Sequence, residues 1–438
     1  MRGLASLLSS LAPSAGLAPR HVAGRENVTE TLLANGMKLI VWSQRDIPNV
    51  ALYNWVRVGS RNEVAGATGL AHFFEHMMFN GTRSRAPGEF DRMMESNGGS
   101  NNAYTSEDVT VYQDWFPRSA LESVLALEAD RLANLAFVDA IIERERSVVQ
   151  SERRLRIEDN SAGALSEAVQ SAAFVAHPYG VPVIGWPADI AAWTLDDLQS
   201  FFKTYYAPNN QTMVLAGDID PDVALKLAQR YLEPIPRREC PAIALPPEPE
   251  QLGERRVSVN RVVQTGLLHY AYKAPPAADP RGPALQLLCS ILSDGNASRL
   301  HRLLVEDRQI AIDVGSVWSE GFDPGLFWIY AAIPEDVSVA TVEEVLDGEL
   351  ARIAGGAITQ KELDRARNMR AASFWKQIST IDGKAQLAGE YEVIHGEWRK
   401  LFDIPDGWDS VSLSKLKDVA AGLLDTRRRT VGTLQGGG

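Results

Sequence analysis

The stretch GLAHFFEHMMFNGT, from Gly69 to Thr82, places two of the chain's seven histidines four residues apart, with a glutamate directly before the second. The spacing of its apolar residues predicts a helix over 69–79. On a helix, residues i, i+3 and i+4 share a face, so His72, Glu75 and His76 project together. Among Phe and Met side chains these polar groups would lose hydration without compensation. The pattern therefore favours a metal site over a helix with solvated polar residues.

Two imidazoles one turn apart can bind Zn²⁺ at ~2.0–2.1 Å, and a tetrahedral catalytic site then needs a third protein ligand and a water. The metal lowers the pKa of such a water towards ~7, and Glu75 is poised to take its proton. This chemistry suits attack on an amide carbonyl. The third ligand should come from another helix, and ERERSVVQSERRLR offers Glu143, Glu145 and Glu152. Spacing alone does not choose among them.

The length and composition of the chain limit its class. At 438 residues it is too long for one core, and ~150 residues per domain predicts two or three units. The apolar content of 45% is ordinary for a globular protein, and the net charge of -12 argues against a nucleic-acid-binding surface. Only Cys240 and Cys289 are present, so no disulfide framework is expected. No run reaches the ~18 apolar residues that a membrane-spanning segment needs.

The chain reads as two similar halves of mixed strands and helices. Strands are predicted within 35–44, 48–60, 101–116, 211–220, 261–272 and 326–333, and helices within 69–79, 118–135, 139–157, 195–206, 221–232, 283–293, 341–353 and 359–378. Residues 234–254 contain six prolines, which favour an extended linker. We therefore predict an α+β protein with domains at 26–233 and 257–438, joined by a linker over 234–256.

The first 25 residues are set apart from the fold. They combine Arg2 with an apolar, Ser-rich stretch, and the first acidic residue is Glu26. A basic start followed by apolar and then small residues is typical of an export signal, whereas the alternative is a disordered tail. Export predicts a periplasmic or otherwise exported protein, and the alternative predicts a cytoplasmic one.

Several further blocks accompany the histidine motif. GSRNEVAGATGLAHFFEHMMFNGT, GGSNNAYTSEDVTVY, ERERSVVQSERR, HPYGVPVIGWPADI and FFKTYYAPNNQTMVLAGDID follow one another in that order. Together they resemble the inverted-motif zinc peptidases, which include pitrilysin, insulin-degrading enzyme and the mitochondrial processing peptidase, and among these the short-chain bacterial type. The resemblance is strong over 28–236 and weak over the second half.

This resemblance implies an architecture and a set of roles. Each half should be an α/β roll in which helices pack on an antiparallel sheet. The family's third zinc ligand falls on Glu152, and a family glutamate that supports the site from behind the ligands falls on Glu145. Asn102 and Ala103 match a strand edge whose backbone pairs with the substrate peptide.

The second half departs from the family's pattern. Active members carry an arginine and a tyrosine, seven residues apart, that hold the substrate carbonyl. In ASRLHRLLVEDRQIAIDV these positions fall on Val305 and Ile312, so both groups are absent. Losing such donors typically costs ~10²–10³ in rate each, so we expect a homologous partner chain to supply them in a heterodimer. The alternative is a non-catalytic structural subunit of the same fold, like the core subunits of a respiratory complex.

Overall fold

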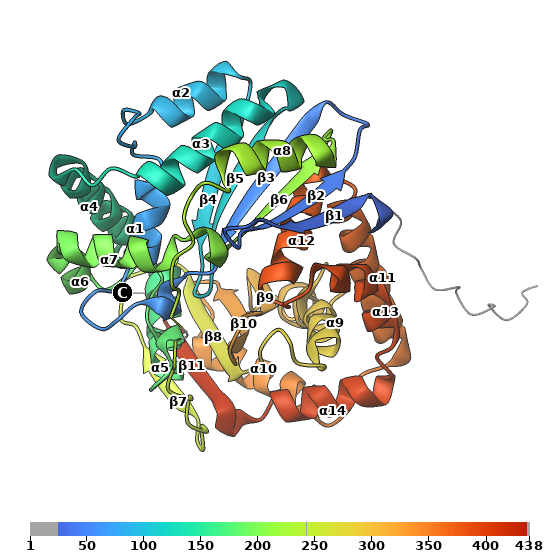
Figure 1. Cartoon of the computed structure of the whole chain (residues 1–438). Helices are drawn as coiled ribbons and strands as arrows, with labels where there is room; N and C mark the ends of the chain where they lie inside the picture. The colour runs from blue at the N-terminus through green and yellow to red at the C-terminus, as the bar shows by residue number, and fades with distance from the viewer. Residues whose placement is uncertain (1–24, 242, 436–438) are drawn as a thin grey trace, which may run out of the picture.

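Two β-sheets and the helices around them form the chain in this computed structural model, which describes residues 25–241 and 243–435 (Figure 1). The first sheet has the order β1-β2-β6-β3-β5-β4, and the second has the order β7-β11-β8-β10-β9. The strands are β1 (Val28–Leu32), β2 (Lys38–Ser43), β3 (Asn49–Val56), β4 (Ser100–Thr105), β5 (Thr110–Pro117), β6 (Gln211–Gly217), β7 (Arg255–Ser258), β8 (Gly266–Lys273), β9 (Asp313–Trp318), β10 (Leu326–Ile333) and β11 (Arg429–Leu434). The predicted α+β class is confirmed.

Helices cover both sheets. They are α1 (Leu70–Met77), α2 (Glu89–Ser96), α3 (Leu121–Asn134), α4 (Asp139–Arg153), α5 (Ser161–Ala173), α6 (Pro187–Ala192), α7 (Leu195–Tyr205), α8 (Pro221–Tyr231), α9 (Gly282–Ser293), α10 (Val339–Ala354), α11 (Gln360–Ile378), α12 (Ile381–Val393), α13 (Ile404–Asp409) and α14 (Leu413–Leu423). Short turns of other helix types also matter below, namely η2 (Ser60–Asn62), η4 (Arg154–Glu158), η5 (Pro178–Gly180) and η7 (His301–Asp307). The described residues between α8 and β7 form no helix or strand, as the prolines predict.

The two sheets share one strand order. Apart from β1, the first sheet follows β2-β6-β3-β5-β4, and the second repeats this arrangement as β7-β11-β8-β10-β9. In the first sheet β6 lies between β2 and β3, parallel to β2 and antiparallel to β3. In the second sheet β11 lies between β7 and β8, parallel to β7 and antiparallel to β8. The expected antiparallel sheets therefore each contain one parallel pair. Because β6 lies between them, β2 and β3 are not neighbours in the sheet, although a turn joins them.

Each half contributes one helix to the other half's sheet. Helix α5 of the first half packs on β7, β8 and β11, whereas α12 of the second half packs on β2, β3 and β6 (Figure 1). Close approach needs glycine at both places, because a Cβ on Gly432 in β11 would overlap Val169 of α5, and one on Gly389 in α12 would overlap the Trp55 indole of β3. The two halves are thus interlocked.

This exchange explains why the central strands are buried on both faces. In the first sheet, Leu39, Leu52 and Leu215 pack with helices of the first half, whereas their neighbours Ile40 and Tyr53 join the core that contains α12. All seven residues of β6 are buried. A strand covered on both faces reads as a continuous apolar run, and VLAG within MVLAGD has that form.

Two further sequence expectations concern the membrane and the N-terminus. Among the described residues, no helix combines the length and the apolar character that crossing a bilayer requires. Nearly all of the predicted export segment, residues 1–24, lies outside the described residues.

The close packing of α12 leads to a stability prediction. We expect Gly389→Ala to lower the free energy of unfolding by ~1–3 kcal/mol, because the new methyl group overlaps the Trp55 ring. Gly348→Ala is the matched control, since it also lies inside a helix but has open space at its Cβ, and it should stabilise by up to ~1 kcal/mol. Urea unfolding measures both, and equal effects of the two substitutions would contradict the interlocked packing.

Candidate metal centre

Helix α1 is held at its start by a carboxylate. Glu63 accepts hydrogen bonds from the backbone N–H groups of Gly69 and Ala71, each at 2.7 Å. The first N–H groups of a helix have no partner within the helix, so an acceptor at this place satisfies them. Burial raises the pKa of Glu63 to about 8, although the hydrogen bonds from Ala71 and Gly69 act in the opposite direction. Gly69 has φ +89°, and a Cβ there would lie 2.6 Å from the Ile184 carbonyl oxygen, so glycine is required. The start and the rotation of α1 are thereby fixed.

The rotation of α1 divides its side chains between core and site. Phe73, Phe74 and Met77 are fully buried in the first half's core. His72 and His76 project from another side, with ring centroids 4.9 Å apart. The sequence prediction that the two imidazoles share a face is therefore confirmed by their geometry.

Helix α4 brings Glu152 to the two imidazoles. The Glu152 Oε2 atom lies 3.2 Å from His76 Nε2, and Oε1 lies 3.6 Å from His72 Nε2. One donor atom from each of these three residues lies within 4.8 Å of the other two, and no other group of this kind occurs in residues 25–241 and 243–435. Two ligands that each lie ~2.0–2.1 Å from a tetrahedral zinc are separated by roughly 3.4 Å. The donor set and its spacing fit Zn²⁺, although the role of these residues as ligands stays a prediction.

The carboxylates around the two imidazoles favour a bound cation. Burial alone would raise the pKa of Glu152, but hydrogen bonds from His72 and His76 and the charge of Arg156 hold that pKa well below its ordinary value. Burial likewise disfavours protonation of His76, yet Glu152, Glu75 and Glu145 outweigh it and raise the pKa of His76. Three carboxylates thus surround one imidazole. Imidazole nitrogens and carboxylate oxygens are also the donors that Zn²⁺ takes in proteins.

Glu145 lies behind His76. Its Oε2 atom is 3.7 Å from His76 Nδ1, on the opposite side of the ring from Glu152, and its other oxygen is 3.1 Å from Arg144 Nε. A carboxylate at the remote nitrogen of a ligating histidine fixes the orientation of the ring and raises its basicity. Of the three glutamates that spacing left open, Glu152 reaches both imidazoles and Glu145 reaches one, whereas Glu143 pairs with Arg146.

Glu75 faces a cavity beside the two histidines. Its Oε2 atom accepts a hydrogen bond of 2.6 Å from Thr105 Oγ1, at the end of β4. The cavity has a volume of about 480 Å³, and its walls include His72, Glu75, Asn102 and Ala103. Strand β4 is the last strand of its sheet. The two residues predicted to contact a substrate therefore lie on an edge strand next to Glu75.

Sequence reasoning missed three residues that shape this site. Thr105 holds Glu75, Glu63 caps α1, and Arg156 lies with Nε 3.0 Å from Glu152 Oε1. A signal for Arg156 was present, because it follows Glu152 by four residues and so lies on the same face of the helix. Thr105 had no such signal, since its contact with Glu75 joins two elements.

Other residues considered from the sequence lie elsewhere. His177 is at the start of η5 and contacts Asp323 rather than the three predicted ligands. Val305 lies in η7, Ile312 precedes β9, and neither lines the cavity at His72. Cys240 and Cys289 are both free thiols.

Comparison with known proteins gives the family. The sequence model of Insulinase (peptidase family M16) matches residues 40–185, and that of the peptidase M16 inactive domain matches 192–370. The zinc protease PqqE of Helicobacter pylori is 30% identical over 437 residues, which span 98% of this chain and 97% of that protein. This chain belongs to peptidase family M16. The short bacterial type expected from the sequence is confirmed.

Solved structures agree with this assignment. The crystal structure of a protease from Helicobacter pylori has a TM-score of 0.90 and 28% identity, and covers 93% of this chain and 99% of that one. The periplasmic protease PqqL from Escherichia coli, at 20% identity, shares the fold with a TM-score of 0.77 over 94% of this chain and 48% of its own. The first M16 match contains His72, Glu75, His76 and Glu152, whereas the inactive-domain match begins after them.

The geometry predicts a graded loss of zinc along α4. Glu152→Gln should abolish stoichiometric binding, because it removes the carboxylate that both imidazoles face. Glu145→Gln should weaken binding by ~10–100-fold, since it acts only through His76. Glu143→Gln is the matched control on the same helix and should bind zinc like the unmodified protein. Competition with a fluorescent chelator measures the three affinities, and an equal loss in all three variants would contradict the assignment.

Proposed function

We propose that this chain is the zinc-bearing catalytic subunit of an M16 endopeptidase that hydrolyses peptides or small unfolded proteins. The observation that carries this proposal is the convergence of His72, His76 and Glu152 beside Glu75, at a cavity that an edge strand borders. The family assignment supports metallopeptidase chemistry, and the two-imidazole, one-carboxylate donor set suits a catalytic zinc with a position left for water.

The chain's own residues divide the work of hydrolysis. When bound, zinc supplies Lewis-acid chemistry, which polarises a peptide carbonyl and acidifies water. Glu75 accepts the proton of the attacking water at a carboxylate oxygen and later delivers it to the leaving amine nitrogen. The hydrogen bond from Thr105 Oγ1 to Oε2 restricts the carboxylate to one orientation during both transfers. Glu145 holds the His76 ring from its Nδ1 side.

Strand β4 defines the form of the substrate. We propose that the backbone at Asn102 and Ala103 pairs with an extended peptide, which adds a strand to the edge of the first sheet. Such pairing needs a substrate segment free of its own secondary structure. This requirement supports peptides and unfolded proteins as the substrate class.

A homologous partner chain completes the proposal. Val305 and Ile312 offer neither a cation nor a hydroxyl group where active members carry arginine and tyrosine. A partner in a heterodimer would supply these donors to the peptide carbonyl. The absence of the arginine and the tyrosine would also suit the alternative, a non-catalytic structural subunit. The presence of all three predicted zinc ligands argues against that alternative. Residues 1–25 support export to the periplasm or beyond rather than a cytoplasmic location.

The assigned base makes the first functional prediction. Glu75→Gln should keep stoichiometric zinc but lose peptide hydrolysis by at least ~10²-fold, because the amide cannot accept the proton. Cleavage of a quenched fluorescent peptide and zinc analysis of the same sample measure both properties. Glu143→Gln controls for the charge change. Retained turnover in Glu75→Gln would refute the assigned base.

The missing arginine and tyrosine lead to the second functional prediction. The chain purified alone should hydrolyse the peptide at least ~10²-fold more slowly than the chain purified together with an M16 homologue encoded beside it, because the lone chain lacks the carbonyl donors. Size-exclusion chromatography establishes whether a complex forms. Full activity from the lone chain would disprove the requirement for a partner.

A further inference from the structure

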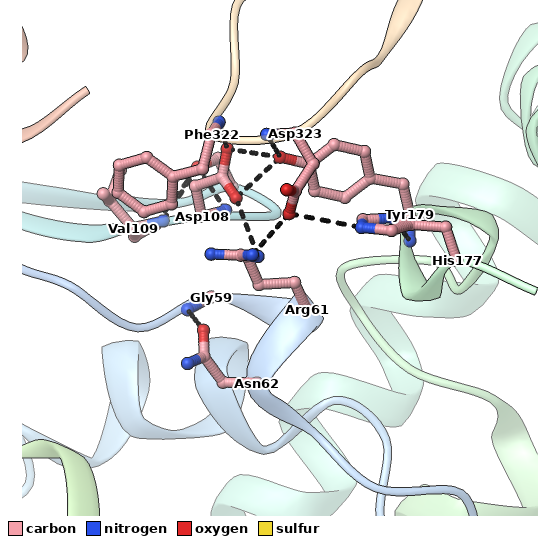
Figure 2. Close-up of polar contacts among 10 residues, drawn as sticks. Gly59, Arg61, Asn62, Asp108, Val109, His177, Tyr179, Phe322 and Asp323 are labelled. Carbon is pink, nitrogen blue, oxygen red and sulfur yellow. Dashed lines mark hydrogen bonds and ion pairs between the residues drawn. The ribbon is translucent and has the colours of Figure 1, made fainter. Parts of the chain in front are cut away.

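A polar cluster joins the two halves of the chain near the cavity that His72 and Glu75 line. Figure 2 shows the guanidinium of Arg61, from η2, between the carboxylates of Asp108 and Asp323. Arg61 Nε lies 3.3 Å from Asp108 Oδ1, and its terminal nitrogen forms a short ion pair with Asp323. Asp108 belongs to the turn between β4 and β5, whereas Asp323 belongs to the loop between β9 and β10. One arginine thus bridges the two sheets.

The loop of the second half fits closely against this turn. The Phe322 N–H donates to Asp108 Oδ2 at 2.8 Å, and the Tyr179 hydroxyl donates to both oxygens of Asp108 at 2.8 and 2.7 Å. The Asp323 N–H in turn donates to the Tyr179 oxygen at 3.1 Å. A Cβ on Gly321 would lie 2.6 Å from Asp108 Oδ2, so the approach leaves no room for a side chain there.

His177 adds a second donor to Asp323. Its Nδ1 accepts the Tyr179 N–H at 3.2 Å, so Nε2 carries the hydrogen and donates to Asp323 Oδ2, also at 3.2 Å. Burial lowers the pKa of His177 despite the neighbouring Asp323, which keeps the ring neutral. Asp323 is therefore held from two sides, by Arg61 and by His177, while its side chain stays 31% exposed.

The first route from this cluster to the site runs through the β4–β5 turn. The N–H groups of Ser60 and Arg61 donate to the carbonyl oxygens of Ser106 and Glu107, at 3.3 and 3.0 Å. The turn is thus clamped by η2 on one side and by the second half's loop on the other. Thr105, the residue directly before this turn, is the one that holds Glu75.

The second route runs through η2 itself. Glu63, two residues after Arg61, donates its N–H to the Ser60 carbonyl at 3.2 Å and accepts from the Gly69 and Ala71 N–H groups with its carboxylate. The segment that Arg61 anchors therefore also carries the cap of α1, the helix of Glu75. Both routes begin at Asp323 and end at the same carboxylate.

We infer that Asp323 is a positioning residue for Glu75. Its carboxylate holds Arg61, and the loop to which it belongs contacts Asp108. Through these contacts the second half fixes both the β4–β5 turn and the start of α1. This inference rests on the proposed function for its catalytic consequence. Its structural consequence does not depend on catalysis, because the fixed segments are defined by hydrogen bonds that are measured without a substrate.

Hydrogen exchange tests the structural part on the full-length chain. Asp323→Ala should speed amide exchange roughly 10-fold in peptides that cover 103–110 and 59–71, because Arg61, whose segment is bonded to the turn, loses one of its two carboxylate partners. Lys38→Gln is the matched control: Lys38 also joins the halves through an ion pair, with Glu392 at 2.5 Å, and it has a similar exposure of 27%. The control should leave both segments unchanged. Unchanged exchange in Asp323→Ala, or equal changes in both variants, would overturn the inference.

A double-substitution cycle tests the catalytic part, with the partner subunit present. Asp323→Ala should lower kcat roughly 10–100-fold with KM within about twofold and zinc content unchanged, because proton transfer depends on the orientation of Glu75, whereas His72 and His76 are also held by Glu152. Thr105→Val removes the hydroxyl that holds Glu75 and should lower kcat similarly. Because both act through one carboxylate, the double variant should fall little below the worse single variant. Multiplying effects would overturn the inference, as would a loss of zinc in Asp323→Ala.

The structural part and the catalytic part of the inference can be refuted independently. If the unmodified complex binds zinc but hydrolyses no peptide, the proposed function fails, and the exchange experiment alone decides whether Asp323 orders the two segments. If hydrolysis is normal in Asp323→Ala, the positioning role fails while the proposed function stands.

Discussion

Three donor atoms from two helices must meet at one point, and the rest of the structure depends on this constraint. His72 and His76 lie on α1, Glu152 lies on α4, and their nitrogen and oxygen atoms approach to 3.2–3.6 Å. Helix α1 can hold its position because Phe73 and Phe74 are buried in the core and Glu63 caps its first turn. Glu75 and the edge strand β4 then lie beside the donors, so the proposed site depends on the placement of one short helix.

The interlocked halves explain why a short chain of the M16 family contains a second sheet that carries none of the predicted ligands. Helix α12 completes the core under β2, β3 and β6, and α5 does the same for the second sheet. Neither sheet is covered on both faces without the other half. The cluster around Arg61 extends this dependence to the site, because the loop at Phe322 and Asp323 contacts the turn that follows Thr105.

Much of the fold and of the site was predictable from local pattern. The strand over 326–333 and the helix over 359–378 match β10 and α11, because their apolar periodicity and capping are local properties. Helices α5 and α12 were missed because neither has a strongly apolar stripe. Most of the buried residues of α12 are alanine and glycine, and α5 buries only Leu165, Val169 and Ala173. The short strand β7, RRVS, was missed because its partner β11 lies far away in sequence. The contacts of Thr105 and Asp323 are likewise long-range, and spacing carries no signal for them.

The central claim is that a metal is held by two imidazoles and one carboxylate. X-ray absorption at the zinc edge of the purified, zinc-loaded protein tests it most directly, because it reports the ligand atoms themselves. Zinc held by His72, His76 and Glu152 should have nitrogen and oxygen neighbours at ~2.0–2.1 Å, with the outer-shell scattering of two imidazole rings. A spectrum without imidazole scattering, or one with sulfur at ~2.3 Å from Cys240 or Cys289, would contradict it.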